Sequence, residues 1–247
     1  MGWFNRKKEE SRQNEEGANN APEASEFDFT EIRKKSMEKC KQAGFTPASS
    51  LPWIKPAKVR PAAEIAGRLN AIKAMVFWLM IPENDLPNEP LQKFIEENNL
   101  THYLSDEEAV IFAGPRDDED WRNAIGWKFE NAWPLAWYFG HKEPEITGKM
   151  MSGEDIQEIL DKYSCPLDEN VEEWAQKLGT IDDEKVLELE DLFYCLHNAA
   201  RSAQMGRDTV PEGFNIMANG GVIHERRLSL TWMISNGTDW EDTDLST

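Results

Sequence analysis

The stretch from Gly221 to Asn236 constrains the fold most, because apolar residues occur on nearly every side of the helix that it predicts. Ile223, Leu230 and Ile234 form one helical stripe, and other apolar residues cover the remaining faces. A helix that is apolar almost all round belongs in the interior of a protein. We therefore predict that this C-terminal helix is central and that the other helices pack around it.

The first two turns of this helix carry three charged residues, Glu225, Arg226 and Arg227. Burying an ion without a partner is very costly, so packed helices must supply opposite charges. Arginine suits this role because its planar guanidinium can form two parallel hydrogen bonds with one carboxylate. We expect Arg122, Arg226 or Arg227 to pair with Glu190, Asp191 or Glu225. The hypothesis predicts a lower melting temperature for Glu225→Gln.

Apolar residues at three- and four-residue spacing, together with capping and turn residues, predict helices over most of the remaining chain. The predicted helices cover residues 29–43, 61–81, 89–98, 105–112, 118–139, 152–163, 168–178 and 182–205. Thr30 is expected to cap the first helix, and Ser105 with Glu108 forms a capping box. Pro134 should end or kink its helix, leaving a second piece up to Gly140, because proline has no N–H to donate.

We find no strand periodicity and no internal repeat, so the chain is predicted to be all-α, a single irregular multi-helix bundle around the C-terminal helix. Residues 1–26 are polar and have little to bury, and we expect a disordered tail there. Residues 27–247 are expected to form one helical domain, since 247 residues with 40% hydrophobic content can build a sizeable core.

The charge balance limits the partners of the chain. It has 27 Lys and Arg residues against 46 Asp and Glu residues, a net charge of −19. Nucleic acid would be repelled, so we expect no nucleic-acid binding, whereas a protein partner fits. The longest apolar run, residues 74–81, is too short to span a bilayer. Three widely spaced cysteines favour a reducing cytoplasm over a disulfide framework or a zinc site.

A polar stripe on the predicted helix 182–205 suggests a cleft between this helix and helix 221–236. The stripe contains Asp191, Tyr194, Asn198 and Arg201, with His197 nearby. The same residues would equally suit a solvated helix face. The candidate catalytic residues are Asp191, His197 and Glu225, and the candidate binding residues are Trp121, Arg122, Tyr194, Arg201, Arg226 and Arg227. Four scattered histidines predict no metal site, and no nucleotide-binding motif indicates a cofactor.

Several short motifs resemble a bacterial family catalogued as domain of unknown function 4272. They are Ile32-Arg33-Lys34-Lys35-Ser36, Glu64-Ile65-Ala66-Gly67-Arg68, Trp121-Arg122, Ala136-Trp137 with Gly140, Asp191-Leu192, Glu225-Arg226-Arg227 with Leu230 and Trp232, and Trp240-Glu241-Asp242-Thr243-Asp244. The resemblance covers about Phe29 to Asp244, and the Glu-Arg-Arg helix with its downstream tryptophan is its most specific part. Ala124 departs from the family, in which an acid often occupies that position. The resemblance implies a helical, cytosolic bacterial protein and brings no assigned activity.

Two functions therefore remain open at the level of the sequence. The first is a non-catalytic interaction or regulatory protein, which the acidic surface and the lack of a catalytic signature favour. The second is an enzyme or small-ligand binder that uses the polar cleft between helices 182–205 and 221–236. The second function requires the polar groups to converge around a concave pocket.

Overall fold

The computed structural model describes residues 27–53, 58–116 and 118–247, so the tail predicted at residues 1–26 lies outside the described residues. Ten α-helices and two short 3-10 helices, η1 and η2, account for the regular structure of the described residues. They are α1 (Phe29–Gln42), α2 (Ala62–Met80), α3 (Asn88–Glu97), η1 (Leu100–Tyr103), α4 (Asp106–Ala109), η2 (Val110–Ala113), α5 (Glu119–Ala124), α6 (Gly126–Tyr138), α7 (Gly153–Lys162), α8 (Val171–Gln176), α9 (Asp183–Gln204) and α10 (Ala218–Ile234). The predicted all-α bundle is confirmed.

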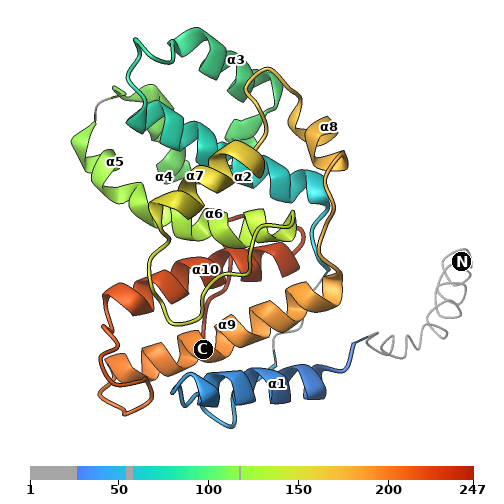
Figure 1. The fold of residues 1–247 in the computed structure, drawn as a ribbon, viewed down its shortest axis with the longest axis vertical. Helices are drawn as coiled ribbons and strands as arrows, with labels where there is room; N and C mark the ends of the chain where they lie inside the picture. The colour runs from blue at the N-terminus through green and yellow to red at the C-terminus, as the bar shows by residue number, and fades with distance from the viewer. Residues whose placement is uncertain (1–26, 54–57, 117) are drawn as a thin grey trace, which may run out of the picture.

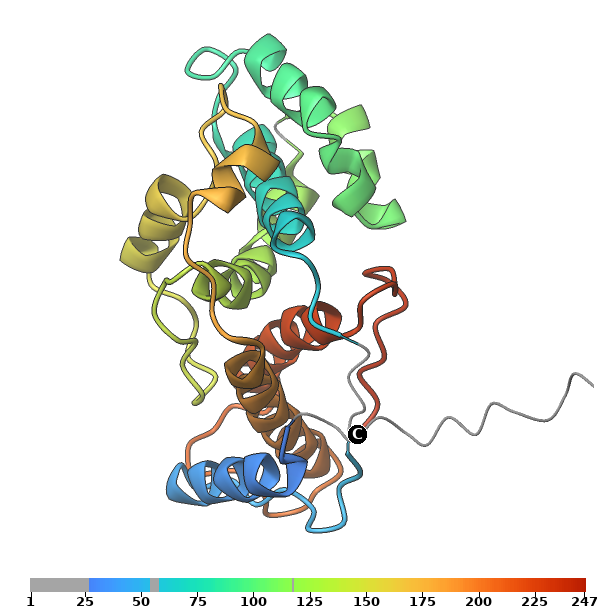
Figure 2. The same ribbon diagram turned by 90° about the vertical axis from the view of Figure 1, so that its right-hand side faces the viewer.

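The helices are stacked so that α10 lies between two neighbours. It packs against α9 on one side and α6 on the other, and α1 covers the far side of α9 (Figure 1). Beyond α6, the long helix α2 packs against α6, α8 and η1. The view turned by 90° shows α1 at one end of the molecule and α3 at the other (Figure 2). This order makes α10 the central helix, as its apolar surface predicts.

The arginine side chains of α10 are buried together with its apolar side chains. Val222, Leu230, Arg226 and Arg227 are all 0% exposed. The helix begins at Ala218, earlier than predicted, because the Asn215 side chain accepts hydrogen bonds from backbone N–H groups at its start. The helix therefore has one more turn than the apolar periodicity indicates.

Helix α6 runs through Pro134, so the prediction that the helix ends there and a second piece begins is wrong. A proline inside a helix removes one hydrogen bond and costs about 3 kcal/mol or more. Trp133 and Trp137, which flank the proline, are only 4% and 6% exposed, and their burial outweighs that cost. The interruption lies earlier, at Ile125, where α5 ends and α6 begins.

Two predicted caps have different outcomes. Ser105 and Glu108 form the predicted capping box at the start of α4. At the start of α1, Asp28 caps the helix in place of Thr30, and its carboxylate accepts from the N–H groups of Thr30 and Glu31. Aspartate accepts these bonds as a charged group and also complements the positive end of the helix dipole.

None of the helices in the described ranges combines the length and the apolar character that crossing a bilayer requires.

Candidate functional site

Arg226 links α10 to α6 through a buried ion pair. Its Nε and Nη2 atoms donate to Oε2 of Glu130 at 2.9 and 2.7 Å. Nη2 also donates to the carbonyl of Lys149 at 2.7 Å, and Nη1 donates to the carbonyl of Glu145. The Arg226 and Glu130 side chains are 0% and 1% exposed. An arginine of the Glu-Arg-Arg helix thus forms the predicted kind of pair, with an acid that the sequence hypothesis did not include.

Two acids proposed as partners for these arginines have other contacts. Asp191 on α9 is paired with Arg33 of α1, with 2.8 Å between Oδ1 and Nη2. Glu225 points to α6, where its Oε2 accepts from Nδ2 of Asn131 at 2.9 Å. Neither carboxylate lines the cavity between α9 and α10 described below. The structure therefore separates Asp191 and Glu225 from His197, the third candidate catalytic residue.

Glu190, the remaining proposed partner, lies in the core beside Arg227. Burial raises its pKa to about 7, although the charge of Arg227 and a hydrogen bond from Thr231 oppose the shift. The Thr231 hydroxyl donates to Oε1 at 2.9 Å. The electrostatic influence is reciprocal, because Glu190 opposes the effect of burial on the pKa of Arg227. Glu190 and Arg227 are therefore a near-neighbour charge pair without a direct hydrogen bond between them in the described contacts.

Arg227 instead begins a chain of hydrogen bonds through two histidines. Its Nη1 atom lies 2.6 Å from Nδ1 of His197, and Nε2 of His197 lies 3.3 Å from Nδ1 of His224. Arginine can only donate, so Nδ1 of His197 must accept and its proton must lie on Nε2. That proton is donated to Nδ1 of His224, which leaves the proton of a neutral His224 on Nε2. Arg227 thereby fixes the tautomers of both rings.

Both histidines of this chain are neutral at pH 7. Burial lowers the pKa of His197 to about 3, and the charges of Arg227 and Arg201 add to the effect. Burial also lowers the pKa of His224. The negative charge of Glu225 opposes this decrease, whereas the positive charges of Arg227 and Arg201 add to it. Neutral imidazoles with fixed tautomers present hydrogen-bond donors of known direction without adding charge.

A cavity of about 570 Å³ lies where these rings approach the surface between α9 and α10. Helix α9 contributes His197, Asn198 and Arg201, and α10 contributes His224. Residues 245–247 also line the cavity, and Arg227 holds this segment by donating to the carbonyls of Leu245 and Ser246. Its volume suits a small molecule. The cavity occupies the place of the predicted cleft and brings together two of the candidate residues, His197 and Arg201.

The other candidate binding residues lie away from this cavity. Tyr194 is 2% exposed and lies between two guanidinium groups, with Arg33 and Arg227 at 5.5 and 4.5 Å from its ring. Arg122 donates to the carbonyl of Leu79 at 2.7 Å and so caps the end of α2. Trp121, half-buried on α5, packs against the edge of the core. In the structure all three have contacts that stabilise the fold.

The family described as domain of unknown function, DUF4272, matches residues 33–243. The chain belongs to the DUF4272 family. No curated protein and no solved structure matches it. The family membership confirms the resemblance found in the sequence motifs.

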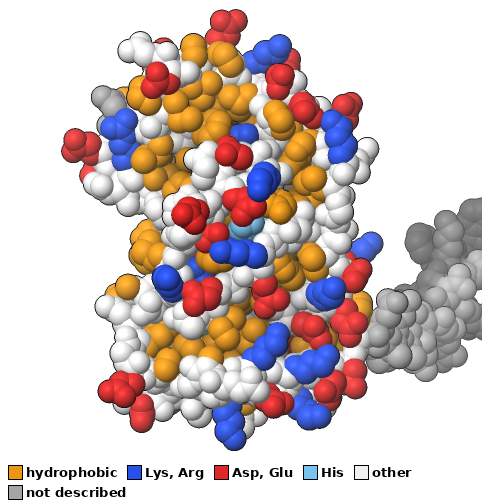
Figure 3. Space-filling model, viewed as in Figure 1, with side chains coloured by type: hydrophobic (Ala, Val, Ile, Leu, Met, Phe, Trp, Pro, Cys, Tyr) orange, Lys and Arg blue, Asp and Glu red, His pale blue; other side chains and the backbone are white. Residues whose placement is uncertain are grey.

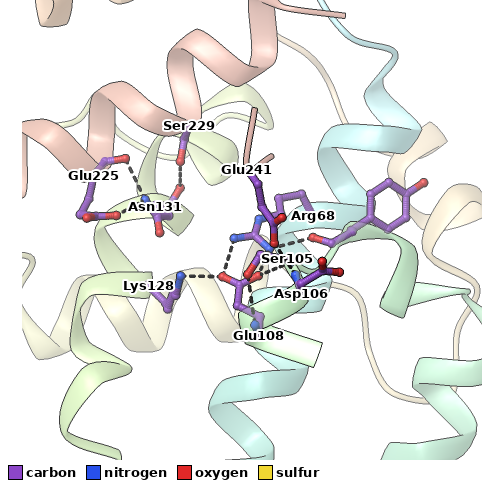
Figure 4. Close-up of polar contacts among 10 residues, drawn as sticks. Arg68, Ser105, Asp106, Glu108, Lys128, Asn131, Glu225, Ser229 and Glu241 are labelled. Carbon is purple, nitrogen blue, oxygen red and sulfur yellow. Dashed lines mark hydrogen bonds and ion pairs between the residues drawn. The ribbon is translucent and has the colours of Figure 1, made fainter. Parts of the chain in front are cut away.

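A second buried ion pair of this DUF4272 member joins Arg68 of α2 to Glu108 of α4 (Figure 4). Arg68 donates through Nη1 and Nη2 to the two carboxylate oxygens of Glu108 at 2.5 and 2.8 Å. Lys128 approaches the same carboxylate at 2.6 Å, and Trp240 stacks on the guanidinium, 3.7 Å from ring centroid to Cζ. Burial alone would raise the pKa of Glu108, but Arg68 and Lys128 outweigh it and lower the pKa to about 2. Arg68 and Trp240 of the motifs therefore connect α2 to the C-terminal segment.

Gly67, which precedes this arginine in the family motif, allows η1 to approach α2. A Cβ atom at Gly67 would lie 2.3 Å from the ring of Tyr103, far inside contact distance. The carbonyl of Tyr103 in turn accepts from Nη1 of Arg68 at 2.7 Å. The glycine and the arginine of the motif thus position the same neighbouring turn.

Sequence reasoning missed Glu130 as an ion-pair residue and His224 as a cavity residue. Glu130 lies in a segment rich in tryptophan, 96 positions before Arg226, and nothing in its spacing links the two. His224 is one of the four scattered histidines, whose spacing in the sequence predicts no metal site. Its position three residues before Arg227 is a signal for a shared site, because such residues lie on one side of a helix.

Proposed function

We propose that this DUF4272 member is a non-catalytic cytoplasmic protein that binds a small anionic molecule in the cavity between α9 and α10. The observation that carries the proposal is the composition of the cavity wall. Its lining contains two cations, Arg201 and Arg207, together with the neutral rings of His197 and His224, and it has no aspartate or glutamate side chain, although the chain has a net charge of −19. A basic hollow in an acidic protein concentrates anions locally.

The recognition would rely on charge and directed donors. Arg201 donates to the neutral amide of Gln204 at 2.7 Å, so this partner leaves its positive charge uncompensated. Guanidinium groups bind carboxylates and phosphates through two parallel hydrogen bonds. His224, which carries its proton on Nε2, adds a neutral donor in the cavity wall. The expected ligand therefore carries carboxylate or phosphate groups.

The proposal predicts that Arg201→Ala and Arg207→Ala each weaken binding of citrate or inorganic phosphate about tenfold or more, since each removes a charge-assisted contact. Isothermal titration calorimetry of the full chain at pH 7 measures this effect. Lys93→Ala is the matched control, because Lys93 is a 67% exposed cation outside the cavity. Two results would contradict the proposal: no binding of citrate or phosphate to the wild type and the control, or equal affinities of all variants.

A second candidate function is binding of a protein partner at the loop that joins α9 to α10. Met205 and Met217, at the two ends of this loop, are 66% and 77% exposed. Exposed methionines are frequent at protein-binding surfaces because the side chain is flexible and polarizable. A pull-down from the native lysate would test this function by comparison with a Met205→Lys, Met217→Lys double variant. Identical eluates would count against it.

A further inference from the structure

A histidine and two carboxylates meet on a different part of the molecule, where α7 packs beside α6. His141 lies in the segment after α6, and Asp155 and Glu158 lie three residues apart on one side of α7. One ligand-capable atom from each residue lies within 4.8 Å of the other two. Figure 1 shows α7 in front of α6, and Figure 3, in the same view, shows acidic and basic side chains gathered over this part of the surface.

The imidazole of His141 is buried without the hydrogen bonds that such a ring normally makes. Its side chain is 1% exposed, and Nε2 has no hydrogen-bond partner among the described residues. The rings of Trp133 and Tyr163 enclose it at centroid distances of 6.2 and 5.1 Å. Buried polar nitrogens are nearly always paired. The described residues give neither Nε2 nor Nδ1 of this ring a hydrogen bond, and Nδ1 is the nitrogen that faces the carboxylates.

The other ring nitrogen faces the carboxylates at a distance that suits a shared cation. Nδ1 of His141 lies 3.8 Å from Oε2 of Glu158, which is too long for a hydrogen bond. Two ligands bound to one tetrahedral zinc ion at about 2.0–2.2 Å lie about 3.4 Å apart. A small movement of the two carboxylates, whose side chains are 15% and 38% exposed, would therefore place nitrogen and oxygen at ligand positions around one ion.

Two lysines hold the carboxylates in the present arrangement. Lys142 lies 2.6 Å from Oδ1 of Asp155, and Lys162 lies 3.0 Å from Oε1 of Glu158. Both lysines are more than half exposed, at 56% and 67%, so solvent screens their ends of the two ion pairs. Oε2 of Glu158 faces the histidine while Oε1 binds its lysine, so the residue can contact both. A cation need displace only Lys142.

We propose that His141, Asp155 and Glu158 bind a divalent first-row transition cation such as Zn²⁺. One imidazole nitrogen and two carboxylate oxygens form a ligand set that zinc accepts, with a fourth position open to water. Burial lowers the pKa of His141 against the opposing charges of Glu158 and Asp155, so the ring has the neutral form that metals bind. Ser152 would orient Asp155, since its hydroxyl donates to Oδ2 at 2.7 Å.

Titration of the full chain with Zn²⁺ at pH 7, followed by calorimetry, tests the proposal. We expect one high-affinity site in the wild type and at least a tenfold weaker affinity in Asp155→Asn and in Glu158→Gln. Both changes are at partly exposed positions on α7, so the fold is retained, and circular dichroism verifies this. Glu154→Gln, at an exposed acid on the same helix, is the matched control and should bind as the wild type does.

Removal of the competing lysine provides an independent readout. Lys142→Gln should bind Zn²⁺ more tightly than the wild type, because the cation no longer has to displace an ammonium group from Asp155. A merely acidic surface would bind zinc weakly and without preference among these variants. No zinc binding by the wild type, or equal affinities of the wild type, Asp155→Asn and Glu158→Gln, would overturn the proposal.

Discussion

Replacing Glu130 with glutamine is expected to lower the free energy of unfolding by about 3–5 kcal/mol, because it leaves the Arg226 charge buried without a counter-ion. The Glu130 side chain is 1% exposed, and the carboxylate also accepts from the backbone N–H of Met151 at 2.8 Å. Its loss therefore weakens both the α6–α10 contact and the segment before α7. Urea unfolding monitored by tryptophan fluorescence measures the effect.

Glu225→Gln is the matched comparison for this prediction. Glu225 is adjacent to Arg226 on α10, but it is half-buried and accepts from the neutral amide of Asn131. A glutamine at this position keeps an oxygen acceptor and leaves no buried charge without a partner. We therefore expect the free energy of unfolding to fall by less than about 1 kcal/mol. The sequence hypothesis predicted a lower melting temperature for Glu225→Gln and did not include Glu130. Equal losses in Glu130→Gln and Glu225→Gln would contradict the assignment of Glu130 as the counter-ion.

Stability is expected to fall on the order of 3 kcal/mol between about pH 5 and pH 2 through the titration of Glu108 alone. The pKa of this carboxyl is lowered from 4.5 to about 2 in the folded protein. The folded state thus binds the proton more weakly than the unfolded state, so the contribution of Glu108 is full above pH 5. Acidification protonates the carboxyl and removes its attraction to Arg68 and Lys128.

Glu108→Gln isolates this contribution. At pH 7 the variant should be about 3–5 kcal/mol less stable than the wild type, because Arg68 remains buried with its charge unpaired. Between pH 5 and pH 2 the stabilities of the two proteins should converge, because protonation removes from the wild type the carboxylate charge at position 108 that the variant lacks. Thermal unfolding in a pH series measures both quantities. A constant difference across this range would show that Glu108 does not titrate with a lowered pKa.

Periodicity predicted the helices well because burial on one face repeats every three or four residues whatever the tertiary partner is. It identified α9 through the buried Val186, Leu189, Phe193 and Leu196, and α10 through its all-round apolar surface. Pro134 was misread because its local cost is visible in the sequence, whereas the burial that offsets the cost depends on tertiary packing.

The contacts between helices were less accessible from the sequence. The need for internal counter-charges near Arg226 and Arg227 follows from burial, but the identity of the partner depends on the register of α6 against α10. Likewise, His197 and Arg201 were recognised from one helix face, whereas His224 joins them only through the packing of α10 on α9. Asp191 belongs to the same predicted stripe, yet α1 packs beside it and supplies Arg33.

The central claim is that α10 is an interior helix whose charges are neutralised by neighbouring helices. A double-mutant cycle with Glu130→Met, Arg226→Met and the combined variant tests it most directly, with free energies of unfolding as the readout. We predict that each single change is strongly destabilising and that the double variant is more stable than additivity predicts by about 2–3 kcal/mol, because it leaves no unpaired buried charge. Additive single effects would contradict the pairing and the interior position of the helix.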